Sequence, residues 1–255
     1  MDPQLSLVIP FYNEERNVDA LCQRLFPAAA AAGVPFEVVC VDDGSRDRTV
    51  ELLRAQQKLH PELVLVRFAR NHGQHAAVTA GFACARGDWI ITLDADLQNP
   101  PEEIINLVER FRAGHDLINT VRRDRQDAWF RRWASRQANR LVRHVSGIRL
   151  NDFGCMLRGY AREVAQAVVA CREYQTFIPA LASLFARNPV EIEVAHAARA
   201  AGTSHYPLTK LFALQLDLIT SFSVWPLKQL FRQRALDDEG RQKLRHARVV
   251  GRVDR

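Results

Sequence analysis

Two aspartates separated by one residue, Asp94 and Asp96, are the first candidates for chemistry in this sequence. They follow the apolar run Trp89–Leu93, which is typical of a buried strand. In extended backbone both carboxylates point to one side, with Ala95 turned away. Two close carboxylates repel unless a cation lies between them, and such oxygens suit Mg²⁺ or Mn²⁺ shared with a diphosphate. The residues leave a second interpretation open, a capping and turn cluster before a helix that begins at Pro101.

Acidic and turn-forming residues also follow two other apolar runs. Leu5–Pro10 is followed by FYNEE, and Phe36–Asp42 by DGSRD. Taken singly, Asp42–Ser45 is a good turn and Glu14 a favourable acid for the first turn of a helix. The carboxyl ends of parallel strands meet at one sheet edge, where ligands bind. We therefore expect these clusters to lie together with Asp94 and Asp96, and their joint placement favours a binding site.

The elements that would position these residues alternate along the chain. Apolar runs separated by stretches of helical spacing predict an α/β fold, a mainly parallel sheet with helices on both faces. The expected strands are Leu5–Pro10, Phe36–Asp42, Leu63–Phe68, Trp89–Leu93 and Leu117–Val121, followed by a strand or turn at Cys155–Leu157, a helix at Ala161–Ala170 and a strand at Val190–Val194. No GxGxxG turn or Walker A sequence is present, so dinucleotide-dependent redox and ATPase functions lose support.

Composition narrows the class of protein further. The 255 residues are 47% hydrophobic and 25% charged, which is typical of a globular protein. The five cysteines are scattered and include no CxxC pair, which favours a reducing compartment over a zinc ribbon or a disulfide framework. Neither a signal peptide nor a transmembrane run of 18 apolar residues is evident in the sequence. The net charge of +6 indicates an anionic partner.

Much of the positive charge lies in one stretch. Arg110–Arg149 contains eleven arginines and three aspartates. It could be a solvated helix face or a nucleic-acid surface, but no RRM, KH or helix-turn-helix signature supports the latter and we expect no nucleic acid. The arginines are mixed with Trp129, Phe130 and Trp133, a composition expected at a lipid headgroup interface. We favour a membrane-facing phosphate site, with the amphipathic Leu211–Leu230 as an in-plane anchor; a core or subunit-contact helix is the alternative for that segment.

Several motifs resemble one family. VIPFYNEE, VVCVDDGSRD, NHGQHAAVTAGF and WIITLDADLQNPPEEI, in this order, look like glycosyltransferase family 2, and more narrowly its polyprenyl-phosphate glycosyltransferases. TVRRDRQDAWFRRWAS, DFGCMLRGY and TFIPALASLFARNPVEIEV are similar to the branch that transfers a formamido-arabinose. The resemblance covers about residues 5–230. It implies a GT-A fold over residues 1–205. The residues themselves predict an amphipathic membrane-interface helix region over 206–231 and a charged tail over 232–255, where the sequence departs from the family pattern.

The resemblance also implies roles for individual residues. The nucleotide would be contacted by Pro10, Tyr12, Glu14 and Asp43, and a Mg²⁺ or Mn²⁺ ion with the diphosphate would be held by Asp94, Asp96 and Gln98. Arg122, Arg131 and Ser135 would handle the phosphates of donor and acceptor, Asp152 would orient the acceptor phosphate or act as a base, and Arg199 matches an interfacial-helix arginine. The NHGQH turn resembles the donor-binding loop of the family, where backbone NH groups at the start of the following helix would meet phosphate, while His72 and His75 make a poor metal site. The sequence departs from the family pattern at Ala198, where an acid is usual, and at His205, where a lysine is usual.

The implied activity is inverting, metal-dependent transfer of a sugar from a UDP-sugar to undecaprenyl phosphate, in lipid A modification. The expected location is the cytoplasmic face of the bacterial inner membrane, with the protein peripheral unless the chain is a shortened form. The expected sugar is 4-deoxy-4-formamido-L-arabinose. The alternatives are transfer of mannose, glucose or another sugar from its nucleotide, and a non-catalytic nucleotide-sugar binding protein. The expected partners are the donor, the lipid acceptor, the membrane surface and a second copy of the chain.

Overall fold

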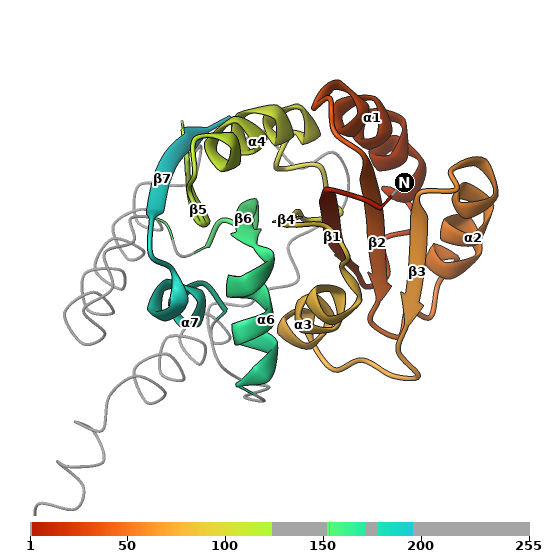
Figure 1. The fold of residues 1–255 in the computed structure, drawn as a ribbon. Coiled ribbons are helices and arrows are strands. Elements are labelled where there is room, and N and C mark those ends of the chain that lie inside the picture. The colour runs from red at the N-terminus through yellow and green to blue at the C-terminus, as the bar shows by residue number, and fades with distance from the viewer. Residues whose placement is uncertain (1, 124–151, 153, 172–177, 196–255) are drawn as a thin grey trace, which may run out of the picture. The chain divides into compact units, whose positions relative to one another are not determined.

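The computed structural model describes residues 2–123, 152, 154–171 and 178–195 (Figure 1). The strands in this part of the chain are β1 (Leu5–Phe11), β2 (Phe36–Asp42), β3 (Leu63–Arg67), β4 (Trp89–Thr92), β5 (Leu117–Arg122), β6 (Arg158–Ala161) and β7 (Pro189–Val194). The helices are α1 (Val18–Ala31), α2 (Thr49–Leu59), α3 (Gln74–Cys84), the short 3₁₀ helix η1 (Pro101–Glu103), α4 (Ile104–Arg112), α6 (Arg162–Ala170) and α7 (Ile178–Phe185).

The described strands form a single sheet in the order β3-β2-β1-β4-β6-β5-β7. β1 pairs in parallel with β2 and β4, β2 with β3, and β5 with β7. β6 runs antiparallel to both of its neighbours, β4 and β5. The amino end of β6 therefore lies at the same edge as the carboxyl ends of the other six strands. The predicted α/β class with a mainly parallel sheet is confirmed.

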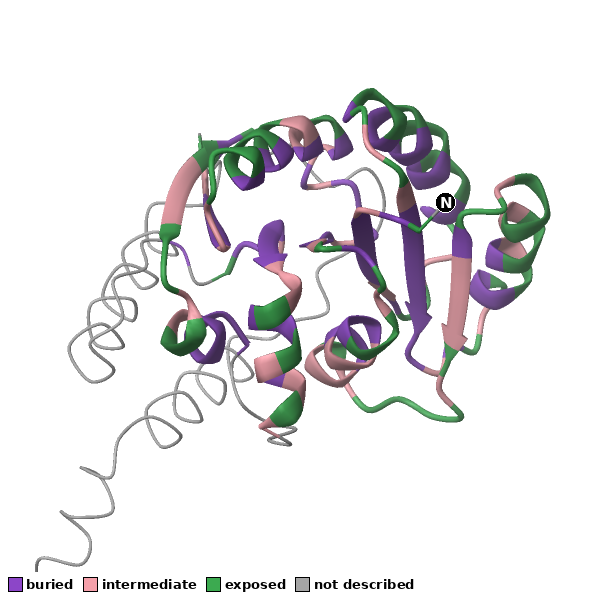
Figure 2. Ribbon diagram, viewed as in Figure 1, coloured by how far each residue is buried: buried purple, intermediate pink, exposed green. Residues whose placement is uncertain are grey.

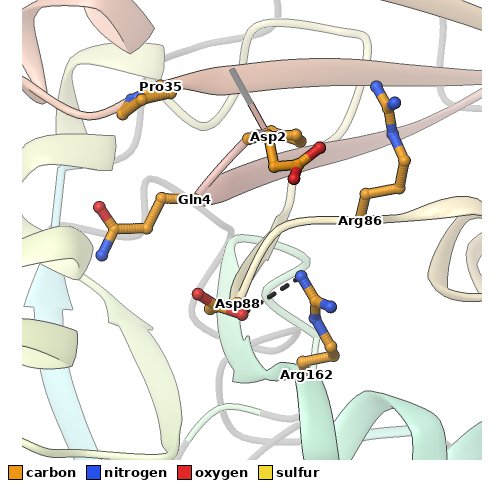
Figure 3. A pocket seen from close by; sticks show the side chains of 7 residues that line it. Asp2, Gln4, Pro35, Arg86, Asp88 and Arg162 are labelled. Atoms are coloured by element: carbon orange, nitrogen blue, oxygen red, sulfur yellow. Dashed lines mark ion pairs between the residues drawn. The ribbon is translucent and has the colours of Figure 1, made fainter.

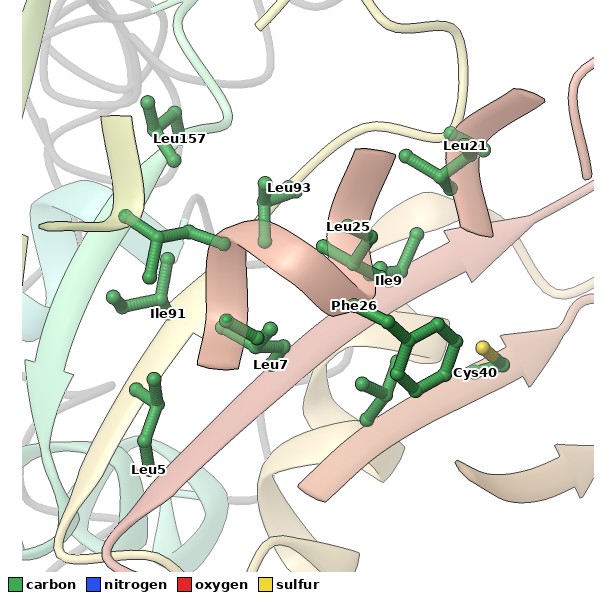
Figure 4. Packing of buried hydrophobic residues seen from close by; sticks show 14 of the residues in the cluster. Leu5, Leu7, Ile9, Leu21, Leu25, Phe26, Cys40, Ile91, Leu93 and Leu157 are labelled. Atoms are coloured by element: carbon green, nitrogen blue, oxygen red, sulfur yellow. The ribbon is translucent and has the colours of Figure 1, made fainter. Parts of the chain in front are cut away.

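Helices cover both faces of the sheet, as Figure 1 shows. Leu7 and Ile9 of β1 pack with α1, α2 and α4 in one apolar cluster, part of which is drawn in Figure 4. Val8 of the same strand faces the other side and packs with α3, α6 and α7. Residues of β1 and β2 are therefore buried on both faces (Figure 2), which explains why these segments read as continuous apolar runs.

Two elements differ from the sequence prediction. The strand or turn expected at Cys155–Leu157 is the segment leading into β6, which begins at Arg158. A fully buried arginine opens this strand, so apolarity did not mark it. α7 was not predicted, because its short apolar sequence has no clear helical or alternating period. The expected helix start at Pro101 is confirmed as the 3₁₀ turn η1 that continues into α4.

The segments that follow residue 195 and the arginine-rich 124–151 lie outside the described residues. This applies to the predicted interface helices at 206–231, the tail at 232–255 and the stretch containing Trp129, Phe130 and Trp133. Within the part of the chain that is described, no helix combines the length and apolarity that a membrane span requires.

Candidate active site

The predicted site residues come together at one edge of the sheet. Pro10 lies in β1, and Tyr12 and Glu14 follow that strand. Asp43 follows β2, while Asp94, Asp96 and Gln98 follow β4. Arg122 ends β5, and Asp152 precedes the antiparallel β6. The topology therefore gathers nine predicted residues on one rim; Arg131, Ser135 and Arg199 lie outside the described residues.

The loops after β1 and β2 are joined by hydrogen bonds. The backbone NH of Asn13 donates to Ser45 Oγ at 2.9 Å, and the NH of Arg46 donates to Asn13 Oδ1 at 2.9 Å. The NH of Glu14 donates to Thr49 Oγ1 at 2.8 Å. These contacts explain the small polar side chains of Asn13, Ser45 and Thr49, because each satisfies a backbone NH group of the opposite segment.

Tyr12 lies on these two connected loops and is 44% exposed. A large aromatic ring left in solvent on a rim of polar loops is suited to stacking against a nucleobase. The position agrees with the nucleotide contact expected for Tyr12, which stays a prediction.

Asp43 is buried and fixes the loop that precedes α3. Its Oδ1 accepts the NH of His72 at 2.7 Å, and its Oδ2 accepts the NH of Gly73 and the Nδ2 of Asn71, both at 2.8 Å. Asp43 thus already accepts the NH groups of His72 and Gly73, and the expectation that NH groups at the start of the following helix meet phosphate stays a prediction. Asp43 shapes the loop in addition to the nucleotide contact that the resemblance implies.

Asp94 is hydrogen-bonded to Gln74, the residue that directly follows the loop 71–73. Gln74, the first residue of α3, donates its Nε2 to Asp94 Oδ1 at 2.9 Å, and Asn99 Nδ2 lies 3.4 Å from Asp94 Oδ2. Sequence reasoning did not identify Gln74 or Asn99. The only signal was their amide side chains beside motifs already singled out, and amides that orient a carboxylate do not stand out from turn residues.

Asp96 is 7% exposed and accepts the NH of Gln98 at 3.1 Å. Between these residues Leu97 has a φ of 61°, a left-handed conformation that costs a leucine about 1–3 kcal/mol. Neither η1 nor α4 has a side-chain cap, so the capping interpretation of Asp94 and Asp96 is wrong. Asp96 does serve a turn, and that part of the alternative is confirmed.

The donor chemistry of this segment fits a hard divalent cation. Asp94 and Asp96 offer carboxylate oxygens and Gln98 an amide oxygen, the ligands that Mg²⁺ and Mn²⁺ prefer. Among the described residues no group of three or more His, Cys, Asp or Glu side chains could hold a metal by itself. An ion at this position would thus take further ligands from a bound diphosphate, as Mg²⁺ commonly does.

Arg122 and Asp152 form a buried ion pair at the other part of the rim. Arg122 Nε donates to Asp152 Oδ2 at 2.7 Å, and Arg122 Nη2 donates to Asp152 Oδ1 at 3.0 Å, so the ion pair is bidentate. Their side chains are 14% and 4% exposed, and Asp152 Oδ1 also accepts the NH of Gly154 at 2.9 Å. Asp152 therefore orients an arginine at the rim.

Two contacts connect the end of β4 and the loop that follows it to the loop before β6. Thr92 Oγ1 donates to the carbonyl of Met156 at 2.5 Å, and Cys155 Sγ lies 3.6 Å from Asn99 Oδ1. Burial raises the pKa of the Cys155 thiol. A buried thiol held in its neutral form is a poor nucleophile, which agrees with the structural role expected for Cys155.

Because His75 is partly buried in the first turn of α3, we expect the free energy of unfolding to depend on pH. Burial lowers its pKa below the ordinary value of 6.5. As the pH falls through 6.5, the unfolded chain binds a proton at His75 before the folded chain does, so the free energy of unfolding decreases. We expect urea unfolding to show a loss of stability between pH 7.5 and 5.5 that is smaller in His75→Gln. Equal losses in both proteins would contradict the assignment to His75.

A cavity of about 570 Å³ opens at the opposite edge of the sheet, beside Gln4, Pro35 and Arg86 (Figure 3). Arg162 and Asp88 form an ion pair across it at 3.2 Å. It lies at the amino ends of β1 and β4, away from the rim that gathers the candidate residues. The chemistry-bearing rim and this cavity are therefore separate features.

Comparison with known proteins agrees with this geometry. Residues 6–169 match the model of the family described as Glycosyl transferase family 2. Undecaprenyl-phosphate 4-deoxy-4-formamido-L-arabinose transferase from Pseudomonas aeruginosa strain LESB58 is 51% identical over 227 residues, covering 89% of this chain and 67% of the relative. The protein of that name from Aeromonas hydrophila is 48% identical over 227 residues, covering 89% and 70%.

Solved structures show the same fold at lower identity. Glucosyl-3-phosphoglycerate synthase from Mycobacterium tuberculosis, in complex with Mn²⁺, UDP and phosphoglyceric acid, superposes with a TM-score of 0.65 at 19% identity, covering 86% of this chain and 77% of that one. The same enzyme with Mg²⁺ and UDP gives 0.64 at 18% identity, covering 86% and 78%. The GT-A fold implied by the resemblance is confirmed. With a family model matched over most of its length and relatives near half identical, the chain belongs to glycosyltransferase family 2 and is a glycosyltransferase.

Proposed function

We propose that this enzyme transfers 4-deoxy-4-formamido-L-arabinose from its UDP derivative to undecaprenyl phosphate at the cytoplasmic face of the inner membrane, for lipid A modification. The observation that carries the proposal is the rim itself, where a paired-carboxylate motif after β4 lies beside an arginine–aspartate pair contributed by β5 and the approach to β6. The choice of sugar and acceptor is supported by the names of relatives about 50% identical over 89% of the chain.

The donor half of the site is the part built on β1, β2 and β4. Tyr12 would stack on the uracil, and Glu14 and Asp43 would line the nucleoside, with Asp43 holding the loop 71–73 in place. Asp94, Asp96 and Gln98 would hold Mg²⁺ or Mn²⁺. When bound, this ion supplies Lewis-acid stabilisation of the negative charge that develops on the departing diphosphate. Gln74 and Asn99 keep the Asp94 carboxylate in one orientation.

The acceptor half is the part built on β5 and the approach to β6. Arg122, oriented by Asp152, would bind a phosphate oxygen of the acceptor. The acceptor oxygen attacks the anomeric carbon from the face opposite to UDP; the new carbon–oxygen bond forms as the bond to the diphosphate breaks, and UDP leaves with the electron pair. The anomeric configuration is therefore inverted.

Asp152→Asn is expected to reduce turnover about 10- to 100-fold, the scale of a misplaced active-site group. The acceptor phosphate has a second pKa near 6 and is largely dianionic at neutral pH, so its attack needs no strong base. What the variant loses is one charge of the pair that orients Arg122. Steady-state rates with undecaprenyl phosphate measure the effect. A loss as large as that of Asp96→Asn would contradict the self-activating acceptor.

The proposal is tested by transfer from labelled nucleotide sugars to undecaprenyl phosphate in detergent, with Mg²⁺, Mn²⁺ or EDTA. We expect lipid-linked product from UDP-4-deoxy-4-formamido-L-arabinose, dependent on the metal and containing the inverted anomer. Product from UDP-glucose or GDP-mannose instead would overturn the choice of sugar and keep the reaction class. Binding of UDP without lipid product from any donor would overturn the proposed acceptor.

Transfer to the acceptor in vesicles tests the membrane part of the proposal. Vesicles containing anionic phospholipid and undecaprenyl phosphate should support faster transfer than neutral vesicles with the same acceptor content, since arginines attract anionic headgroups. If the transfer rate is the same in anionic and neutral vesicles, and the same at low and at high salt, an electrostatic membrane surface is contradicted.

A further inference from the structure

Arg158, the first residue of β6, is completely buried. Arginine is almost never fully buried without partners, because removing its charge from water is costly. No carboxylate among the described residues forms an ion pair with it within 4.0 Å. Its guanidinium instead contacts three oxygens that all belong to the acceptor half of the proposed site, so its burial has a specific local consequence.

The three acceptors come from two different segments. Arg158 Nη2 donates to the backbone carbonyl of Asp152 at 2.7 Å, and Arg158 Nε donates to the backbone carbonyl of Cys155 at 2.9 Å. The third contact is a short hydrogen bond from Arg158 Nη1 to Asn119 Oδ1 on β5. The planar guanidinium thus holds the backbone at both Asp152 and Cys155 and ties these two residues to β5.

Asp152 also contacts the end of β5. Asp152 gives its backbone carbonyl to Arg158 and its carboxylate to Arg122. Arg122 lies three residues beyond Asn119 on β5, so the contacts close a ring from Arg158 through Asn119, β5, Arg122 and Asp152 back to Arg158. Gly154 packs closely against this ring, because a Cβ at this position would lie 3.1 Å from Arg122 Nη2.

From this ring we infer that Arg158 is a positioning residue for the acceptor. It fixes the backbone at Asp152 and Cys155 so that the Asp152 carboxylate holds the Arg122 guanidinium in the orientation that receives the acceptor phosphate. The inference rests on the proposed function for the identity of the acceptor. A lysine cannot replace Arg158, because one ammonium nitrogen cannot reach three oxygens placed around a planar fork. The donor half, built on β1, β2 and β4, makes none of these three contacts.

The test compares Arg158→Lys with the matched control Arg162→Lys. Arg162 also donates to a backbone carbonyl, that of Gly87 at 3.1 Å, but at the opposite edge of the sheet. In Arg158→Lys we expect kcat/KM for undecaprenyl phosphate to fall about 10- to 100-fold, with UDP affinity in the presence of Mn²⁺ within about twofold of wild type. The Arg162→Lys variant should keep both values.

Amide hydrogen exchange gives a readout that does not depend on activity. The NH of Gly154, which donates to Asp152 Oδ1, should exchange faster in Arg158→Lys and at the wild-type rate in Arg162→Lys. Unchanged exchange and acceptor kinetics in Arg158→Lys, or equal loss of UDP and acceptor binding, would overturn the inference. If Arg158→Lys does not fold, Asn119→Ala decides by the same two readouts. Absence of transfer by the wild-type enzyme would refute the proposed function and leave the exchange result to judge Arg158.

Discussion

Asp96→Asn is expected to reduce sugar transfer about 1000-fold, because the variant removes one of the two charges that would hold a cation against the departing diphosphate. The fold should persist. Asparagine has the shape of aspartate and its Oδ1 can accept the NH of Gln98, the contact that Asp96 makes in the turn after β4. The two interpretations of this motif, metal site and turn, therefore predict opposite results for one substitution.

Mn²⁺ binding in the presence of UDP, followed by electron paramagnetic resonance, measures the metal half of this prediction, and the melting temperature measures the turn half. We expect weakened Mn²⁺ binding at an almost unchanged melting temperature. Asp116→Asn is the matched control: Asp116 also accepts backbone NH groups, those of Arg187 and Asn188, but at the opposite edge of the sheet. It should keep full activity. An active Asp96→Asn enzyme with normal Mn²⁺ binding would reduce Asp96 to a turn residue.

The rim could be predicted from sequence because it depends on two local properties. Continuous apolar runs such as the VVCV of β2 mark strands buried on both faces, and the order of parallel strands places their carboxyl ends together. Asp94, Asp96 and the residues after β1 and β2 follow directly from these rules. Their meeting at one edge therefore needed no knowledge of side-chain contacts.

The contacts that orient the rim could not be predicted in the same way. Asp43 accepts the NH groups of His72 and Gly73, nearly 30 residues away, and Arg158 reaches Asn119 across a strand pair. Both depend on tertiary approach, which hydrophobic period does not encode. A charged residue that opens a short antiparallel strand also breaks the apolar pattern, so Arg158 could be read only as part of a loop until its burial was known.

Gly44→Ala is the second substitution with a large expected effect. Gly44 has a φ of +72°, and a Cβ at this position would lie 2.5 Å from the carbonyl carbon of Arg70 and 2.7 Å from the backbone nitrogen of Asn71. The left-handed backbone costs an alanine about 1–2 kcal/mol, and displacing the packed backbone adds about 1–3 kcal/mol. We expect the free energy of unfolding to fall by about 3 kcal/mol, measured by urea denaturation.

Gly33→Ala separates the two causes. Gly33 has a similar φ of +68°, but a Cβ there would meet no atom closer than 3.9 Å, so only the backbone term applies and a loss of about 1 kcal/mol is expected. The segment that Gly44→Ala displaces is the one whose amides hold Asp43, so this variant should also weaken UDP binding while Gly33→Ala should not. Equal losses in both variants would show that conformation alone selects glycine at position 44. A larger loss at Gly44, accompanied by weaker UDP binding, would show that the nucleotide end of the rim depends on the close approach of two backbones.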